Sequence, residues 1–192
     1  MKKRPFAYYM INGITVYRIA AAPVMMALLF YGPPTWFKWL VGLSFFTDLI
    51  DGVLARMFRV NSALGARLDS IGDDLTVLIT TAGLFMKRPE LLTEQLAWLL
   101  PLLLLFLIQT GLALYRYGRI SSFHTRLAKL AALAQGLFIL SFYFFDTVNY
   151  PLFYAAVSIT LLELIEEIVL VYWFKEWTTD VKGLIWVWKK QR

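Results

Sequence analysis

The chain has 192 residues, of which 59% are hydrophobic and 17% are charged, and its formal net charge at pH 7 is +6. A mean hydropathy of +0.62 is too high for an ordinary soluble domain, so the sequence predicts one compact membrane domain over residues 1–192. The absence of cysteine excludes disulfides and thiolate metal sites, and the positive charge of a membrane protein indicates anionic headgroups rather than nucleic acid.

The N-terminal segment predicts a short interfacial helix that leads into a first membrane span at about residues 13–31. Asn12, Thr15 and Arg18 recur every three residues and would line one side of the cytoplasmic end of this span. Two explanations fit Arg18 equally well: its side chain reaches the membrane surface from within the span, or it faces a ligand.

Five further apolar segments complete the predicted fold, an all-α integral membrane protein with six transmembrane helices. The predicted spans lie at about residues 13–31, 35–58, 63–86, 94–117, 124–145 and 151–174. With both termini in the cytoplasm, every Lys and Arg except Lys38, Lys87 and Arg88 falls on the cytoplasmic side. This asymmetry follows the positive-inside rule and supports the six-span topology.

Four aspartates lie within or beside the second and third predicted spans. Asp48 and Asp51 are three residues apart, and Asp69 and Asp73 are four apart, so each pair shares one face of its helix. A carboxylate at bilayer depth costs roughly 3 kcal/mol on insertion scales, so several together indicate a functional site. Because hard divalent cations favour oxygen ligands, these residues predict a metal site.

The pattern D-x2-D-G-x2-A-R-x8-G-x3-D-x3-D runs from Asp48 to Asp73 and resembles the signature of the CDP-alcohol phosphatidyltransferases. The other fixed positions that match are Asp51, Gly52, Ala55, Arg56, Gly65 and Asp69. Aspartates that only held helices together through salt bridges would not require the small residues of this pattern. Small residues let two helices, or a helix and a ligand, approach closely.

The resemblance implies a transferase that moves the phosphatidyl group of CDP-diacylglycerol to a small polar alcohol and releases CMP. It implies that two Mg²⁺ or Mn²⁺ ions are bound by Asp48, Asp51, Asp69 and Asp73, and that Asp73 is the general base. Nucleotide binding would fall to Gly52, Ala55, Arg56 and Gly65, with Asn12 and Thr15 on the side that faces the nucleotide. The expected location is a bacterial-type inner (cytoplasmic) membrane, with the active site towards the cytoplasm. Membrane lipids are expected partners, and the choice between a monomer and a homodimer is left open.

The acceptor is predicted from basic residues near the start of the fifth span. Arg116, Arg126 and Lys129 would bind a phosphate, because both residue types donate charged hydrogen bonds to phosphate oxygens. Positive-inside anchoring is the alternative explanation for them. The phosphate interpretation favours glycerol 3-phosphate, with inositol phosphate, phosphatidylglycerol and serine as alternatives. A membrane cation transporter is the non-enzymatic alternative.

Three glutamates in the sixth predicted span, Glu163, Glu166 and Glu167, share one helix face. Carboxylates within a span need partners, and we expect these among Arg18, Arg126 and Lys129.

Overall fold

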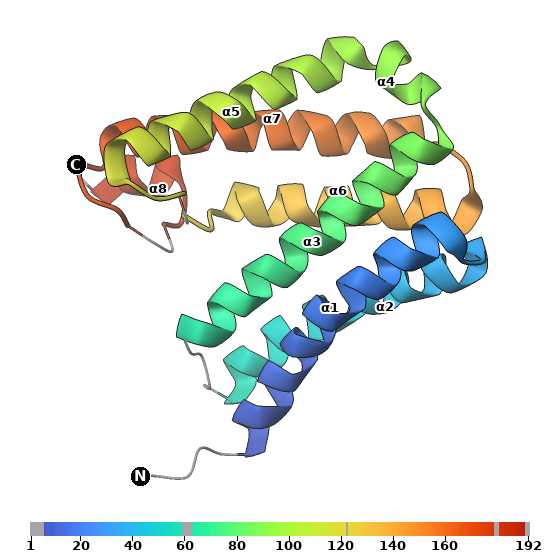
Figure 1. The fold of residues 1–192 in the computed structure, drawn as a ribbon. Helices are drawn as coiled ribbons and strands as arrows, with labels where there is room; N and C mark the ends of the chain where they lie inside the picture. Colours follow the sequence, from blue (N-terminus) through green and yellow to red (C-terminus); the bar gives the residue numbers. More distant parts are fainter. Residues whose placement is uncertain (1–5, 59–62, 122, 179–180, 191–192) are drawn as a thin grey trace. The chain divides into compact units, whose positions relative to one another are not determined.

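The computed structural model describes residues 6–58, 63–121, 123–178 and 181–190, and some helical side chains within these ranges lie outside the description. Regular structure in these ranges is entirely helical (Figure 1). The helices are α1 (Phe6–Tyr31), α2 (Pro34–Phe58), α3 (Ala63–Lys87), α4 (Glu90–Glu94), α5 (Leu96–Tyr117), α6 (Arg126–Phe145), α7 (Tyr150–Trp173) and α8 (Leu184–Lys190). They form two compact units: unit 1 comprises Met1–Lys87 and Tyr143–Phe145, and unit 2 comprises Arg88–Phe142 and Asp146–Arg192.

The all-helical prediction is confirmed, but the N-terminal interfacial helix is not a separate element. Helix α1 runs without a break from Phe6 to Tyr31, because the segment before the predicted span contains no residue that would stop a helix. The C-terminal helix α8 was not predicted.

Two helices in the described part of the chain are long and apolar enough to cross a membrane. They are α5 and α6, with mean hydropathies of 2.1 and 1.6. Only 11% of the apolar stretch of α5 is buried, so this helix presents its leucines outward, unlike the core helix of a soluble protein.

Capping residues explain where α6 and α7 begin and where α5 and α6 end. Thr125 and Asn149 are the N-caps of α6 and α7, and their side-chain oxygens accept first-turn backbone N–H groups at 3.0 and 3.1 Å. Gly118 and Asp146 follow α5 and α6 in the left-handed conformation, with φ of 67° and 54°.

In unit 1, α1 packs against both α2 and α3. Buried residues recur every three or four positions on the facing sides, which is the pattern of helices that share a core. They are Ala21, Ala22 and Met25 of α1, Phe37, Val41 and Ser44 of α2, and Thr76, Ile79, Thr80 and Leu84 of α3. Tyr143 belongs to this core, since its hydroxyl donates to the Thr80 carbonyl oxygen at 2.7 Å and its ring lies 5.0 Å from that of Phe37.

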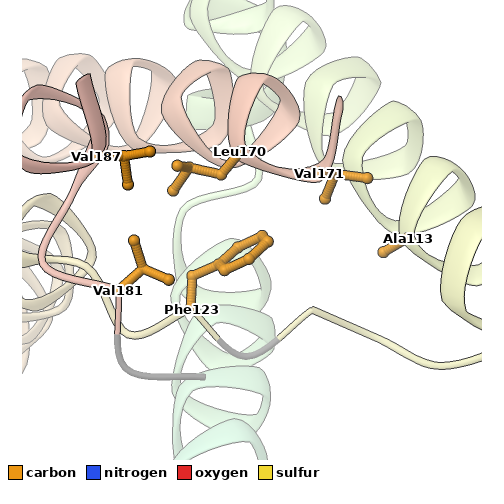
Figure 2. Packing of buried hydrophobic residues seen from close by; sticks show 6 residues of the cluster. All are labelled: Ala113, Phe123, Leu170, Val171, Val181 and Val187. Atoms are coloured by element: carbon orange, nitrogen blue, oxygen red, sulfur yellow. The ribbon is translucent and has the colours of Figure 1, made fainter. Parts of the chain in front are cut away.

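In unit 2, α5 packs along α7, and α6 reaches α7 through side chains. The rings of Phe138 and Phe153 lie 5.5 Å apart, and Gln135 Nε2 donates to Thr160 Oγ1 at 2.7 Å. The C-terminal segment folds back over one end of this unit. Its valines join an apolar cluster made of Ala113, Phe123, Leu170, Val171, Val181 and Val187 (Figure 2).

Polar side chains cross-link the same end of unit 2. Glu167 Oε2 accepts from Gln109 Nε2 at 2.6 Å and from Ser121 Oγ at 2.8 Å. Glu166 Oε1 accepts from the backbone N–H of Leu184 at 2.9 Å. Neutral donors from α5, the following loop and α8 therefore reach these two glutamates, for which Arg18, Arg126 and Lys129 were the expected partners.

Candidate active site

An arginine from α1 joins two aspartates that are distant in the sequence. Arg18 Nη1 lies 2.8 Å from Asp48 Oδ1 on α2, and Arg18 Nη2 pairs with Asp73 Oδ1 on α3. The Arg18 side chain is only 1% exposed, whereas those of Asp48 and Asp73 are 39% and 42% exposed. A buried guanidinium thus draws together two carboxylates that remain accessible from outside.

The helical register of α1 explains the burial of Arg18. Ala21 and Ala22 follow it at three and four positions and are buried on the same face. On α3, Gly72 lies beside the long side chain: a Cβ atom at Gly72 would lie 3.4 Å from the Arg18 Cβ, which is an ordinary van der Waals contact. Small residues of α1 and α3 therefore lie beside the charged cluster.

Of the four predicted metal ligands, the structure describes the side chains of Asp48 and Asp73 and brings them to one guanidinium. Asp51 lies one turn beyond Asp48 in α2, and Asp69 lies one turn before Asp73 in α3. The remaining predicted residues of the motif lie on the same helices, and the two polar residues of the N-terminal pattern lie on α1. Eight of these residues lie outside the described side-chain environments: Asn12, Thr15, Asp51, Gly52, Ala55, Arg56, Gly65 and Asp69.

The chemistry of the described donors fits a cation. Asp48 and Asp73 present carboxylate oxygens from two helices, and these are the ligand atoms that Mg²⁺ favours. Among the described side chains, no three acidic or histidine groups converge to hold a metal ion. A complete ligand set would therefore need Asp51 or Asp69.

The predicted acceptor-binding residues belong to unit 2. Arg116 lies in the last turn of α5 and its Nε donates to the Phe174 carbonyl oxygen at 3.0 Å. Arg126 and Lys129 lie in the first turn of α6, and both have exposed side chains.

The carboxylate partners of Arg18 are a finding of the structure that the sequence analysis does not predict. The sequence places Arg18 with Asn12 and Thr15, either facing a ligand or reaching the membrane surface. The signal for a different role was a lone cation in the apolar run of residues 13–31. A fully buried arginine requires carboxylate partners, and the acidic motif supplies them.

The chain matches the family model of the CDP-alcohol phosphatidyltransferases over residues 9–165. It is 39% identical over 72 residues to a CDP-diacylglycerol–glycerol-3-phosphate 3-phosphatidyltransferase of Cereibacter sphaeroides, covering 35% of this chain and 33% of that protein. A chloroplastic/mitochondrial protein with the same activity in its name, from Arabidopsis thaliana, is 36% identical over 94 residues, or 45% and 31% of the two chains. The cardiolipin synthase (CMP-forming) of Streptomyces coelicolor is 34% identical over 83 residues, or 40% and 39%.

The alignments thus span about a third of the length of these curated relatives. No solved structure matches the chain.

Proposed function

Because this chain belongs to the CDP-alcohol phosphatidyltransferase family, we propose that it transfers the phosphatidyl group of CDP-diacylglycerol to an alcohol and releases CMP. The observation that carries the proposal is the convergence of Asp48 and Asp73, the first and last aspartates of the motif, on the guanidinium of Arg18. Their accessible carboxylates lie close together, and phosphoryl transfer depends on charged groups that are positioned in this way.

We propose Asp48, Asp51, Asp69 and Asp73 as ligands of two Mg²⁺ or Mn²⁺ ions. When bound, such ions would neutralise the pyrophosphate and the developing charge on the leaving CMP. Binding of the CDP moiety is assigned to Gly52, Ala55, Arg56 and Gly65, together with Asn12 and Thr15 on α1.

Asp73 is proposed as the general base. The acceptor oxygen forms a bond to the phosphatidyl phosphorus, the bond from that phosphorus to CMP breaks, and the hydroxyl proton passes to Asp73. Arg18 holds one oxygen of this carboxylate, which fixes its orientation and leaves the accessible part of the group for the acceptor hydroxyl.

The favoured acceptor is glycerol 3-phosphate. Arg116, Arg126 and Lys129 supply positive charge for its phosphate, and the relatives from Cereibacter and Arabidopsis carry this acceptor in their names. The Streptomyces relative, named a cardiolipin synthase, keeps phosphatidylglycerol as an alternative acceptor. Inositol phosphate and serine are further alternatives.

The proposed setting is a bacterial-type inner membrane with six spans, both termini and the active site towards the cytoplasm. Besides α5 and α6, four helices reach the roughly 20 residues that a span requires: α1, α2, α3 and α7. Carboxylates in α2, α3 and α7 lower their hydropathy, but charged groups in spans are tolerated where they pair within the protein.

The test is release of CMP from CDP-diacylglycerol by the purified chain in lipid nanodiscs. We expect release that requires an alcohol acceptor and Mg²⁺ or Mn²⁺, and that Asp48→Asn abolishes. Glu176→Gln, which alters an exposed carboxylate in unit 2, is the matched control and should retain full activity. Metal-independent release, or release unaffected by Asp48→Asn, would refute the assignment of this cluster.

A further inference from the structure

The segment that ends in α8 is fixed to the loop between α5 and α6, the two helices that are long and apolar enough to cross a membrane. The backbone N–H of Val181 donates to the Phe123 carbonyl oxygen at 2.8 Å, and Trp177 Nε1 donates to the Ile120 carbonyl oxygen at 3.0 Å. A loop between two membrane-crossing helices lies at the bilayer surface. The C-terminal segment, held to this loop, lies at the same level.

Helix α8 has one face inside the protein and one face outside it. Val187 is 6% exposed and points into the apolar cluster with Leu170 and Val181 (Figure 2). Ile185 and Trp188, which share the opposite face at a spacing of three, are 71% and 57% exposed. The outer face therefore carries large apolar groups that are mostly exposed.

The orientation of α8 is imposed by α7. The Glu166 carboxylate accepts the N–H of Leu184, the first residue of α8. Gly183 precedes it with a φ of +129°, and a Cβ atom there would lie only 3.0 Å from Glu166 Oε1. Packing and this backbone contact together hold the apolar face outward rather than leaving it to rotate.

Cations lie beside two tryptophans of this C-terminal segment. Lys182 Nζ lies 5.4 Å from the centre of the Trp186 ring, and Arg119 Cζ lies 4.7 Å from that of Trp177. The exposed cations of this end of unit 2 include Arg116, Arg119, Lys175, Lys182 and Lys189. Tryptophans with adjacent Lys and Arg are typical of the membrane–water interface.

We propose that α8, together with Trp177 and Lys182 before it, is an interfacial anchor that binds anionic phospholipid headgroups. Ile185 and Trp188 enter the headgroup and acyl boundary, and Lys182 and Lys189 contact lipid phosphates. A second copy of the chain suits this face less well, because a symmetric contact would bring the same cations against each other. The inference uses the proposed membrane insertion but not the transferase activity, which is measured separately.

The cysteine-free sequence allows a direct test. A spin label attached to Ile185→Cys or Trp188→Cys, in the full chain in nanodiscs, reports contact with membrane-soluble oxygen or with a water-soluble nickel chelate. Nanodiscs of phosphatidylcholine alone are compared with nanodiscs that also contain phosphatidylglycerol. We expect greater oxygen than nickel contact at both positions, corresponding to immersion of roughly 5–10 Å, and a larger immersed fraction with phosphatidylglycerol.

Charge removal provides the matched comparison. Lys182→Gln with Lys189→Gln should lower the ratio of immersed to detached label about fivefold for each lysine. Lys38→Gln with Lys87→Gln removes the same charge from unit 1 and should leave the ratio unchanged. Labels that face water in both lipids, equal immersion in both lipids, or label-to-label coupling from a dimer contact would each overturn the proposal.

Discussion

Arg18 and Asp48 form an ion pair between α1 and α2, with 2.8 Å between Nη1 and Oδ1. Because the same guanidinium also binds Asp73, one side chain from α1 links the first and last aspartates of the acidic motif. An arginine buried without such partners would cost several kcal/mol, so the motif stabilises α1 as well as forming the proposed site.

Replacing Arg18 with glutamine should lower the stability of unit 1 by about 1–3 kcal/mol, because two charged hydrogen bonds are lost from a buried position. Arg88→Gln is the control, since Arg88 pairs with Glu90 at 3.6 Å where both are exposed. That pair should contribute at most about 1 kcal/mol. Thermal unfolding of the purified variants measures both effects, and equal midpoints for Arg18→Gln and the unaltered chain would contradict the role given to Arg18.

Two glycines of α3 should respond differently to alanine. At Gly83 a Cβ atom would lie 2.5 Å from the Tyr143 hydroxyl oxygen and 2.7 Å from Leu29 Cδ1, so Gly83→Ala should cost about 1–3 kcal/mol. At Gly72 the nearest atom is 3.4 Å away, and alanine gains up to about 1 kcal/mol of helix propensity.

Thermal unfolding midpoints of the two variants decide this prediction. Adding Tyr143→Phe to Gly83→Ala removes the hydroxyl that clashes and should recover part of the loss. If Gly72→Ala proved the more damaging change, the packing described for α3 would be incorrect.

Much of unit 1 follows from local sequence. The predicted turn at Gly32 separates α1 from α2, although Pro34 already belongs to α2, and the spacing of the aspartates indicates which helix faces carry them. The pairing of Arg18 could not be predicted, because several carboxylates were available and the choice depends on how α1, α2 and α3 pack together.

In unit 2, prediction from the sequence fails for a different reason. Helix α8 has only seven residues, too few for a periodic signal, and it contains aromatic and β-branched residues with modest helix propensity. Its position depends on Val187 packing in the apolar cluster and on Glu166 accepting from Leu184. Both contacts join segments that are separated in the sequence.

The Glu167 network should make a measurable contribution to the stability of unit 2. Glu167→Leu leaves Gln109, which is 4% exposed, without its carboxylate acceptor and should cost about 1–3 kcal/mol. Glu167→Gln retains an acceptor oxygen and should cost less. In a Gln109→Leu background the loss from Glu167→Leu should shrink, and an undiminished loss would show that the two side chains are not coupled.

Substitutions of Asp73 and of Asp51 should differ in their effects on the binding of CDP-diacylglycerol and metal. Asp73→Asn should retain most CDP-diacylglycerol binding but lower turnover about 10²–10⁴-fold, as expected when a general base is removed. Asp51→Asn should weaken metal and nucleotide binding as well. Equilibrium binding of CDP-diacylglycerol with Mn²⁺, compared with turnover of the same preparations, distinguishes them. Equal binding defects in the two variants would make Asp73 chiefly a ligand.

The most direct test of the proposed activity is to identify the lipid formed from labelled CDP-diacylglycerol when each acceptor is supplied in turn. We predict phosphatidylglycerol phosphate from glycerol 3-phosphate, lost on removal of divalent cations and weakened by Lys129→Ala. Efficient product from serine or free inositol, with glycerol 3-phosphate inert and Lys129→Ala harmless, would contradict the acceptor assignment. Failure of every acceptor to yield a labelled phospholipid and CMP would contradict the transferase function itself.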